Sequence, residues 1–120
     1  IAKVVIIGHS YGGGLVTSLV ENWNSHLPVE IHSIAGPIGS EFNTGGCNYS
    51  PPKYISDNAD FYQWKTQKHL DAVFKGLKND PQDLTLKGSQ VTRLPSSYRG
   101  RRLGHNWSIS WVADHLVSNN

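Results

Sequence analysis

The segment that most constrains this chain is Gly8-His9-Ser10-Tyr11-Gly12, in which a serine lies between two glycines. It follows residues 1–7, a near-continuous β-branched apolar run typical of a parallel strand that is buried on both faces and central in its sheet. The residues beyond it carry apolar side chains at helical spacing, at Leu15, Val16, Leu19, Val20 and Trp23. The sequence therefore predicts a strand, a tight turn that carries Ser10, and a helix of about three turns.

The spacing of the two glycines has a physical explanation if Ser10 lies at the tip of a sharp turn. Such a turn strains the serine backbone, and side chains two residues before or after it would collide with neighbouring backbone. We therefore expect both Gly8 and Gly12 to be required. The turn also places the backbone N–H of Tyr11 at the helix start, where it can stabilise a developing oxyanion. A phosphate-binding loop would need a terminal Gly-Lys-Ser/Thr, which is missing here.

The rest of the chain predicts an α/β fold with a mostly parallel sheet flanked by helices. Three further strands are expected, at residues 29–35, 61–66 and, more weakly, 89–94. Residues 36–60 are rich in Gly, Pro, Asn and Ser and predict a long loop, while 68–77 fits a helix or irregular structure. A closing helix is expected at 108–117, with the Ser108 hydroxyl at its N-cap.

Size and composition exclude several classes of protein. At 120 residues the chain is at most one domain, or part of one. A formal charge of +2 is far below that of a nucleic-acid-binding face, and no apolar run approaches the roughly 18 residues that cross a bilayer. Cys47 is the only cysteine, so an internal disulfide and a CxxC site are excluded, and we expect a free thiol in a glycine-rich loop.

The serine turn also resembles a known family. Gly8-His9-Ser10-Tyr11-Gly12-Gly13 resembles the G-H-S-x-G-G segment of lipases and related α/β-hydrolases, and Ala35-Gly36-Pro37-Ile38-Gly39-Ser40 is similar to the Pro-x-x-Gly-Ser turn of many lipases. The resemblance implies a serine esterase or lipase of the α/β-hydrolase fold. It implies hydrolysis of an ester or lipid through an acyl-enzyme, with no metal or organic cofactor.

The resemblance covers nearly all of residues 1–120 but only about the second half of that fold, from the nucleophile strand onward. It implies that the chain is a fragment of a longer one, or is completed by its missing N-terminal part or by a second chain. The apolar strand 1–7 would then have an open edge. We therefore expect the isolated 120 residues to be unstable.

A serine nucleophile needs a histidine to take its proton and a carboxylate to orient that histidine. In the family the order is nucleophile, acid, histidine. His105 lies between the last predicted strand and the last helix, as the family's catalytic histidine does, whereas His69 would reverse the order. Asp71, shortly after the third predicted strand, resembles the family's acid. The carboxylates that remain as alternatives are Asp57 and Asp80.

Three features bear on the substrate. The resemblance places His9, Ile38 and Phe42 at the substrate-binding surface. Loop 36–60 fits a lid or acyl-binding wall and equally an ordinary exposed connection. A basic turn, with Arg99, Arg101 and Arg102, could meet an anionic group but is more typical of a solvated turn. Two other functions stay open, namely acyl transfer or thioester hydrolysis with the same triad, and a non-catalytic interaction module.

Overall fold

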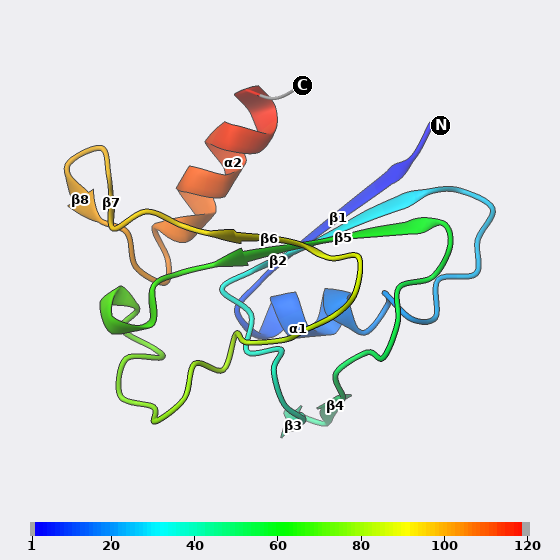
Figure 1. Ribbon diagram of the computed structural model, residues 1–120, viewed down its shortest axis with the longest axis horizontal. Helices are drawn as coiled ribbons and strands as arrows, with labels where there is room; N and C mark the ends of the chain where they lie inside the picture. Colours follow the sequence, from blue (N-terminus) through cyan, green and yellow to red (C-terminus); the bar gives the residue numbers. More distant parts are fainter. Residues whose placement is uncertain (1, 119–120) are drawn as a thin grey trace.

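The computed structural model describes residues 2–118, which adopt an α/β architecture (Figure 1). A four-stranded sheet has the order β1-β2-β5-β6, and every neighbouring pair is parallel. Its strands are β1 (Val4–His9), β2 (Val29–Ile34), β5 (Ala59–Lys65) and β6 (Gln90–Arg93). Helices α1 (Tyr11–Thr17) and α2 (Ser108–Ser118) lie on opposite sides of the sheet (Figure 1). The parallel sheet predicted from the sequence is thus confirmed.

The core is divided between the two faces of the sheet, because successive strand residues point to opposite sides. On the α1 side, Ile31 and Phe61 are paired in register and buried with Val20. On the α2 side, Ile34 is buried with Val112 and with residues from the segments that follow β5 and β6. Both faces of the two central strands, β2 and β5, are therefore packed.

Strand β1 differs from the prediction in its position. It pairs with β2 alone in the described structure, so it is an edge strand rather than a central one. Val4 and Ile6 pack against the α1-side cluster, whereas Val5 and Ile7 are 49% and 52% exposed. The apolar run indicates burial on both faces, but only one face of β1 meets a core cluster.

Helix α1 is shorter than the predicted helix, which extended to Trp23. It ends at Thr17, and residues 18–22 form tight turns. The backbone N–H groups of Leu19 and Val20 each donate to a carbonyl three residues back, which tightens the chain beyond the α-helix. Val20 is nevertheless fully buried, so part of the apolar period still marks core contacts.

The loop predicted for residues 36–60 contains a small antiparallel hairpin, β3 (Phe42–Thr44) and β4 (Cys47–Tyr49). Its turn residues Gly45 and Gly46 have φ values of 59° and 81°, which suit the tight turn of a hairpin. The remainder is irregular up to the start of β5. The hydroxyl of Tyr49 donates to the carbonyl oxygen of Ile38 at 2.8 Å, which ties the hairpin to the core on the α1 side.

In the second half of the chain, residues 68–77 fit the prediction of helix or irregular structure, whereas a hairpin and the start of the last helix depart from the predictions. Residues 68–77 begin with the 3₁₀ helix η1 (Lys68–Leu70) and continue as turns. A second hairpin, β7 (Ser97–Tyr98) and β8 (Arg101–Arg102), was not expected. The closing helix α2 is confirmed, but Ser108 is its first residue rather than its N-cap, and its hydroxyl donates to the carbonyl oxygen of His105. Within residues 2–118, no helix combines the length and apolar composition needed to span a bilayer.

Candidate active site

Ser10 occupies the turn between β1 and α1 in a strained backbone conformation, with φ 59° and ψ −125°. A non-glycine residue at such a φ costs about 1–3 kcal/mol, which the surrounding structure must offset. Backbone hydrogen bonds on both sides hold it in place. The N–H of Ser10 donates to the carbonyl oxygen of Ile34 at 2.9 Å, and the N–H of Gly13 donates to the carbonyl oxygen of Ser10 at 2.9 Å. The strained turn expected from the sequence is present.

The two glycines of the turn are not equivalent. A Cβ added to Gly8 would lie 2.1 Å from the carbonyl oxygen of Gly12, closer than atoms can approach. A Cβ added to Gly12 would meet no atom within 4 Å. The expectation that both positions require glycine is therefore wrong for Gly12. The reason is that the first turn of α1 folds back over the end of β1, while Gly12 itself faces open space.

We expect Gly8→Ala to destabilise the protein by about 3 kcal/mol, because the new methyl group collides with backbone that cannot move away without opening the turn. Gly12→Ala is the matched control, and alanine at this helical position is expected to stabilise by up to about 1 kcal/mol. Urea unfolding followed by circular dichroism measures both free energies of unfolding. Equal stabilities of the two variants would contradict the steric explanation.

His105 and Asp71 form a buried pair beyond the carboxyl ends of the strands. His105 lies between β8 and α2, and Asp71 follows η1 directly. The Nδ1 atom of His105 is 2.9 Å from Oδ2 of Asp71, and the two residues are 8% and 0% exposed. A carboxylate can only accept, so Nδ1 carries the proton and Nε2 is left free to take one. This is the tautomer that a general base requires.

The carboxylate of Asp71 accepts four hydrogen bonds from described residues. Oδ1 accepts from the N–H groups of Val73 at 2.9 Å and Phe74 at 3.1 Å. Oδ2 accepts from the hydroxyl of Thr66 at 2.6 Å and from His105. Burial by itself raises the pKa of this carboxyl, but the hydrogen bonds from His105 and Thr66 hold the pKa below its usual value. Asp71 is therefore ionised at neutral pH.

Further contacts hold His105 from other sides. The ring of Phe74 meets its ring edge-on, with centroids 5.0 Å apart and planes at 89°. The carbonyl oxygen of His105 accepts from the Ser108 hydroxyl at 2.6 Å and from Nε2 of His9 at 2.8 Å. Within residues 2–118 no hydrogen bond joins the Ser10 hydroxyl to His105. The serine turn and the histidine loop, which is the loop that carries His105, are instead linked through His9, the residue before Ser10.

The rival acids and the rival histidine lie elsewhere. Asp80 accepts from Arg93 at 3.0 Å and from the backbone of Gln82. Asp57 and His69 are exposed, Asp57 before β5 and His69 in η1. Of the carboxylates that the sequence left open, the structure joins only Asp71 to His105 in its described part.

The predicted oxyanion residue Tyr11 and the predicted substrate residues Phe42 and Ile38 differ in their surroundings. Tyr11 is the first residue of α1, where N–H groups have no intrahelical partner, and its side chain is 53% exposed. Its ring meets that of half-buried Phe42 edge-on at 5.4 Å, and Phe42 stacks on Tyr49 at 4.9 Å. Ile38 is only 2% exposed and belongs to the α1-side core, so its side chain presents no surface to a substrate. Tyr11 and Phe42 thus form an aromatic contact at the start of α1, the helix that follows Ser10.

The basic turn and the lone cysteine lie in exposed hairpins. Arg99 pairs with Asp114 at 3.0 Å, and Arg101 lies over the ring of Trp107 at 5.0 Å. Arg102 is exposed in β8, and Cys47 is an exposed free thiol in β4. Among the residues that the structure describes, no group of three histidine, cysteine, aspartate or glutamate side chains is arranged to hold a metal ion.

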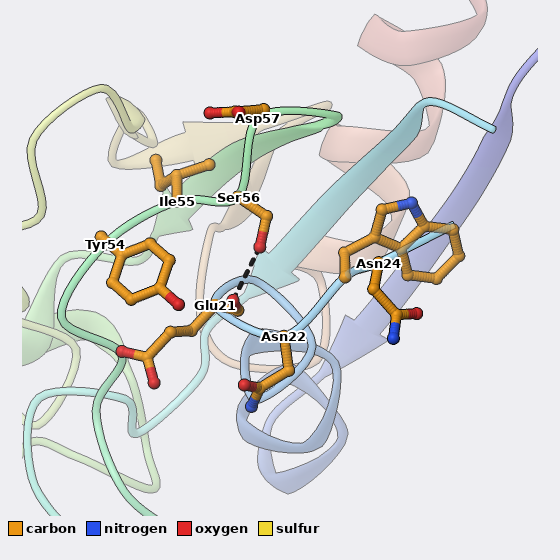
Figure 2. Close-up of a pocket in the computed structure, with 8 residues that line it drawn as sticks. Glu21, Asn22, Asn24, Tyr54, Ile55, Ser56 and Asp57 are labelled. Atoms are coloured by element: carbon orange, nitrogen blue, oxygen red, sulfur yellow. Dashed lines mark hydrogen bonds between the residues drawn. The ribbon is translucent and has the colours of Figure 1, made fainter. Parts of the chain in front are cut away.

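Figure 2 shows a cavity whose lining segments precede β2 and β5, so it lies at the opposite end of the sheet from Ser10. It is lined by two segments that lead into the amino ends of β2 and β5, namely residues 21–24 and 54–57. The Ser56 hydroxyl donates to the carbonyl oxygen of Glu21 at 2.7 Å and joins these segments (Figure 2). Ligands of open α/β sheets bind at the carboxyl ends of the strands, where Ser10 and His105 lie. The cavity is therefore separate from the candidate site.

The sequence did not indicate three of the supporting residues. Thr66, Phe74 and Ser108 hold Asp71 or His105, yet each looked like an ordinary strand, loop or helix residue. Only the turn-forming habit of aspartate, whose carboxylate binds backbone N–H groups two or three residues ahead, could have suggested the local contacts of Asp71. The contacts of Thr66 and Ser108 span only five and three residues, but the sequence carried no signal for the backbone geometry that they need. The contact between Phe74 and His105 joins distant parts of the chain and needs the fold.

Comparisons of this chain with models of protein families, with curated proteins and with solved structures gave no match in any of the three. The chemistry must be argued from the geometry alone. A strained serine, a buried histidine with a free Nε2 and an ionised aspartate are the parts from which nucleophilic acyl transfer is built.

Proposed function

We propose that this protein is a serine hydrolase that cleaves carboxylic esters through Ser10, His105 and Asp71. The observation that carries the proposal is the buried hydrogen bond between His105 and Asp71, joined through His9 to a turn that holds Ser10 at positive φ. Strain of this kind concentrates at functional sites because it lowers stability without benefit to packing. A structural role alone does not explain why a serine occupies this position.

In the proposed reaction, the Oγ of Ser10 attacks the ester carbonyl while Nε2 of His105 takes the hydroxyl proton. The same proton passes to the alkoxide as the carbonyl–oxygen bond breaks, so an alcohol leaves and an acyl-serine remains. Water, deprotonated by His105, then releases the carboxylic acid and restores the serine. Asp71 stabilises the imidazolium that forms at each step and stays ionised throughout.

The N–H of Tyr11 is the proposed oxyanion donor from this chain. It lies at the first position of α1, directly after the nucleophile, where backbone N–H groups are free to bind the developing negative charge. Helix α1 has only seven residues, so the donor itself contributes more than the helix dipole does. The succession of β1, strained Ser10 and α1 also supports a more specific proposal for the α/β architecture, namely the α/β-hydrolase fold.

The surface beside Ser10 favours substrates with an apolar acyl group. Tyr11 is exposed, and its contact with Phe42 forms an aromatic surface next to the nucleophile. Burying an acyl chain against aromatic side chains contributes about 25 cal/mol per Å² of apolar area removed from water. Esters of lipid-like carboxylic acids are therefore the proposed substrate class.

Reaction with a fluorophosphonate tests the proposal, because this reagent modifies only an activated serine. We expect the folded protein to gain one adduct by intact mass, and peptide mapping to locate it at Ser10. The matched control is the same protein unfolded in urea, which keeps every serine but loses the His105–Asp71 pair. Equal labelling of folded and unfolded protein, or an adduct on another serine, would contradict the proposal.

A further inference from the structure

The backbone carbonyl of His105 is held from two directions. The Ser108 hydroxyl donates to it at 2.6 Å from three residues ahead, within the same stretch of chain. Nε2 of His9 donates to it at 2.8 Å from the serine turn, which is 96 residues away in the sequence. The first contact orders the histidine loop locally, whereas the second connects that loop to the residue adjacent to Ser10.

The chemistry of the second contact is unambiguous, because a carbonyl oxygen can only accept. His9 must therefore carry a proton on Nε2. Burial lowers the pKa of His9, which keeps its ring neutral at neutral pH. Its ring is 4.8 Å from that of His105 and tilted by 55°. A neutral donor can hold the loop without repelling the imidazolium that forms on His105 during the proposed reaction.

The other contacts of His105 do not fix its distance from Ser10. Asp71 and Phe74 fix the orientation of its ring, but both belong to the segment that follows β5. Ser10 is held by Ile34 at the end of β2. Without His9, the separation between the serine and the histidine would depend on how the β5 segment and the histidine loop pack on the sheet.

We propose that His9 is a positioning residue, which sets the separation between Oγ of Ser10 and Nε2 of His105 through its hydrogen bond to the His105 carbonyl. The inference rests on the proposed function and deepens it. The sequence placed His9 at the substrate, whereas its ring nitrogen is engaged with the protein. Reacting atoms must approach within about 3–3.5 Å, and a misplacement of about 1 Å can cost about 100-fold in rate.

Two variants of equal side-chain length test the donor. His9→Gln keeps an N–H at the position of Nε2, whereas His9→Met fills similar space without a donor. We expect His9→Met to lower the rate constant of fluorophosphonate labelling, and kcat for p-nitrophenyl butyrate, by about 10- to 100-fold with little change in KM. His9→Gln should stay within about threefold of the unmodified protein. Equal rates for the two variants, whether fast or slow, would overturn the inference.

Ser108→Ala is the matched control, since it removes the other donor to the same carbonyl oxygen but keeps the link to the serine turn. Its slowing should be much smaller than that of His9→Met, and equal slowing would overturn the inference. Proton NMR follows the Nδ1–H of His105, whose low-field signal should persist in both variants because Asp71 still accepts it. Loss of this signal in His9→Met would indicate disruption of the acid pair rather than of positioning.

The outcomes separate the inference from the function on which it rests. If the unmodified protein reacts and His9→Met reacts equally fast, His9 has no positioning role and the proposed function stands. If the unmodified folded protein shows no reaction at Ser10, the proposed function fails and the inference fails with it. Thermal unfolding of each variant confirms that the rates compared belong to folded protein.

Discussion

Replacing Ser10 with alanine is expected to lower kcat for ester hydrolysis by about 10⁶-fold, because the reaction loses its nucleophile rather than one of its supports. This corresponds to about 8 kcal/mol of lost transition-state stabilisation. The folded state should be unaffected, since the Ser10 side chain makes no capping hydrogen bond and alanine keeps the same backbone restrictions. Stability within about 0.5 kcal/mol of the unmodified protein is expected.

Release of p-nitrophenol from p-nitrophenyl butyrate measures kcat for both proteins and checks the expected loss. Ser18→Ala is the matched control, because Ser18 follows the other end of α1 and its hydroxyl bonds only a local carbonyl. Its rate should be unchanged. Retention by Ser10→Ala of even a hundredth of the activity would show that another group performs the chemistry.

Asp71→Asn is expected to lower kcat by about 10⁴-fold while the fold is retained. The backbone N–H groups of Val73 and Phe74 both donate to Oδ1, so the asparagine oxygen must occupy that position. The amide NH₂ then replaces Oδ2 and faces Thr66 and His105. Because an NH₂ group donates, it favours the His105 tautomer with the proton on Nε2, which cannot accept the serine proton.

The carboxylate that the sequence left open provides the control for this prediction. Asp57→Asn makes the same chemical change at an exposed position beside the cavity of Figure 2, and its rate should stay within about twofold. Steady-state kinetics measures kcat for both variants, and circular dichroism verifies that each is folded. If Asp71→Asn retains more than a tenth of the activity, Asp71 is not the partner of the base.

Much of the fold could be predicted because each parallel strand has its own local signal. β2 and β5 carry β-branched or aromatic runs that are long enough to identify without knowing their neighbours. The position of β1 in the sheet could not be predicted, since an apolar run indicates burial but does not say how many strands pair with it. The end of α1 at Thr17 was missed because the apolar period continues into turns that place Val20 in the core.

The hairpin formed by β7 and β8 had a signal that was too short to recognise. Its turn needs positive φ at Arg99 and Gly100, with values of 53° and 74°, and arginine is an unusual residue there. Only Gly100 marked the turn in the sequence. Strands of two residues also lack the alternation from which a longer strand is predicted.

For the site, local pattern indicated the serine turn, whereas the pairing of His105 with Asp71 was an expectation taken from the family resemblance. The turn can be recognised from the sequence because Gly8 is required by a clash with the carbonyl oxygen of Gly12, which lies within the same five residues. The contact of His9 could not be predicted, because it joins residues 96 positions apart that only the folded sheet brings together. The contact of Thr66 spans five residues, but nothing in the sequence showed that the chain turns back to Asp71 there. The expectation that Gly12 must be glycine was wrong because it depends on the direction in which an added Cβ would point in the folded chain.

The hydrogen bond between His9 and His105 also bears on how the protein reaches its working state. It joins residues 96 positions apart, and the bond between Asp71 and His105 spans 34. Contacts of such separation form late in folding, because the entropy of closing the intervening chain is lost before they stabilise anything. Ser10 can thus lie in its turn before its base arrives. Under the proposed function, a chain that is still folding would therefore carry an unreactive serine, and reactivity would coincide with the completed structure.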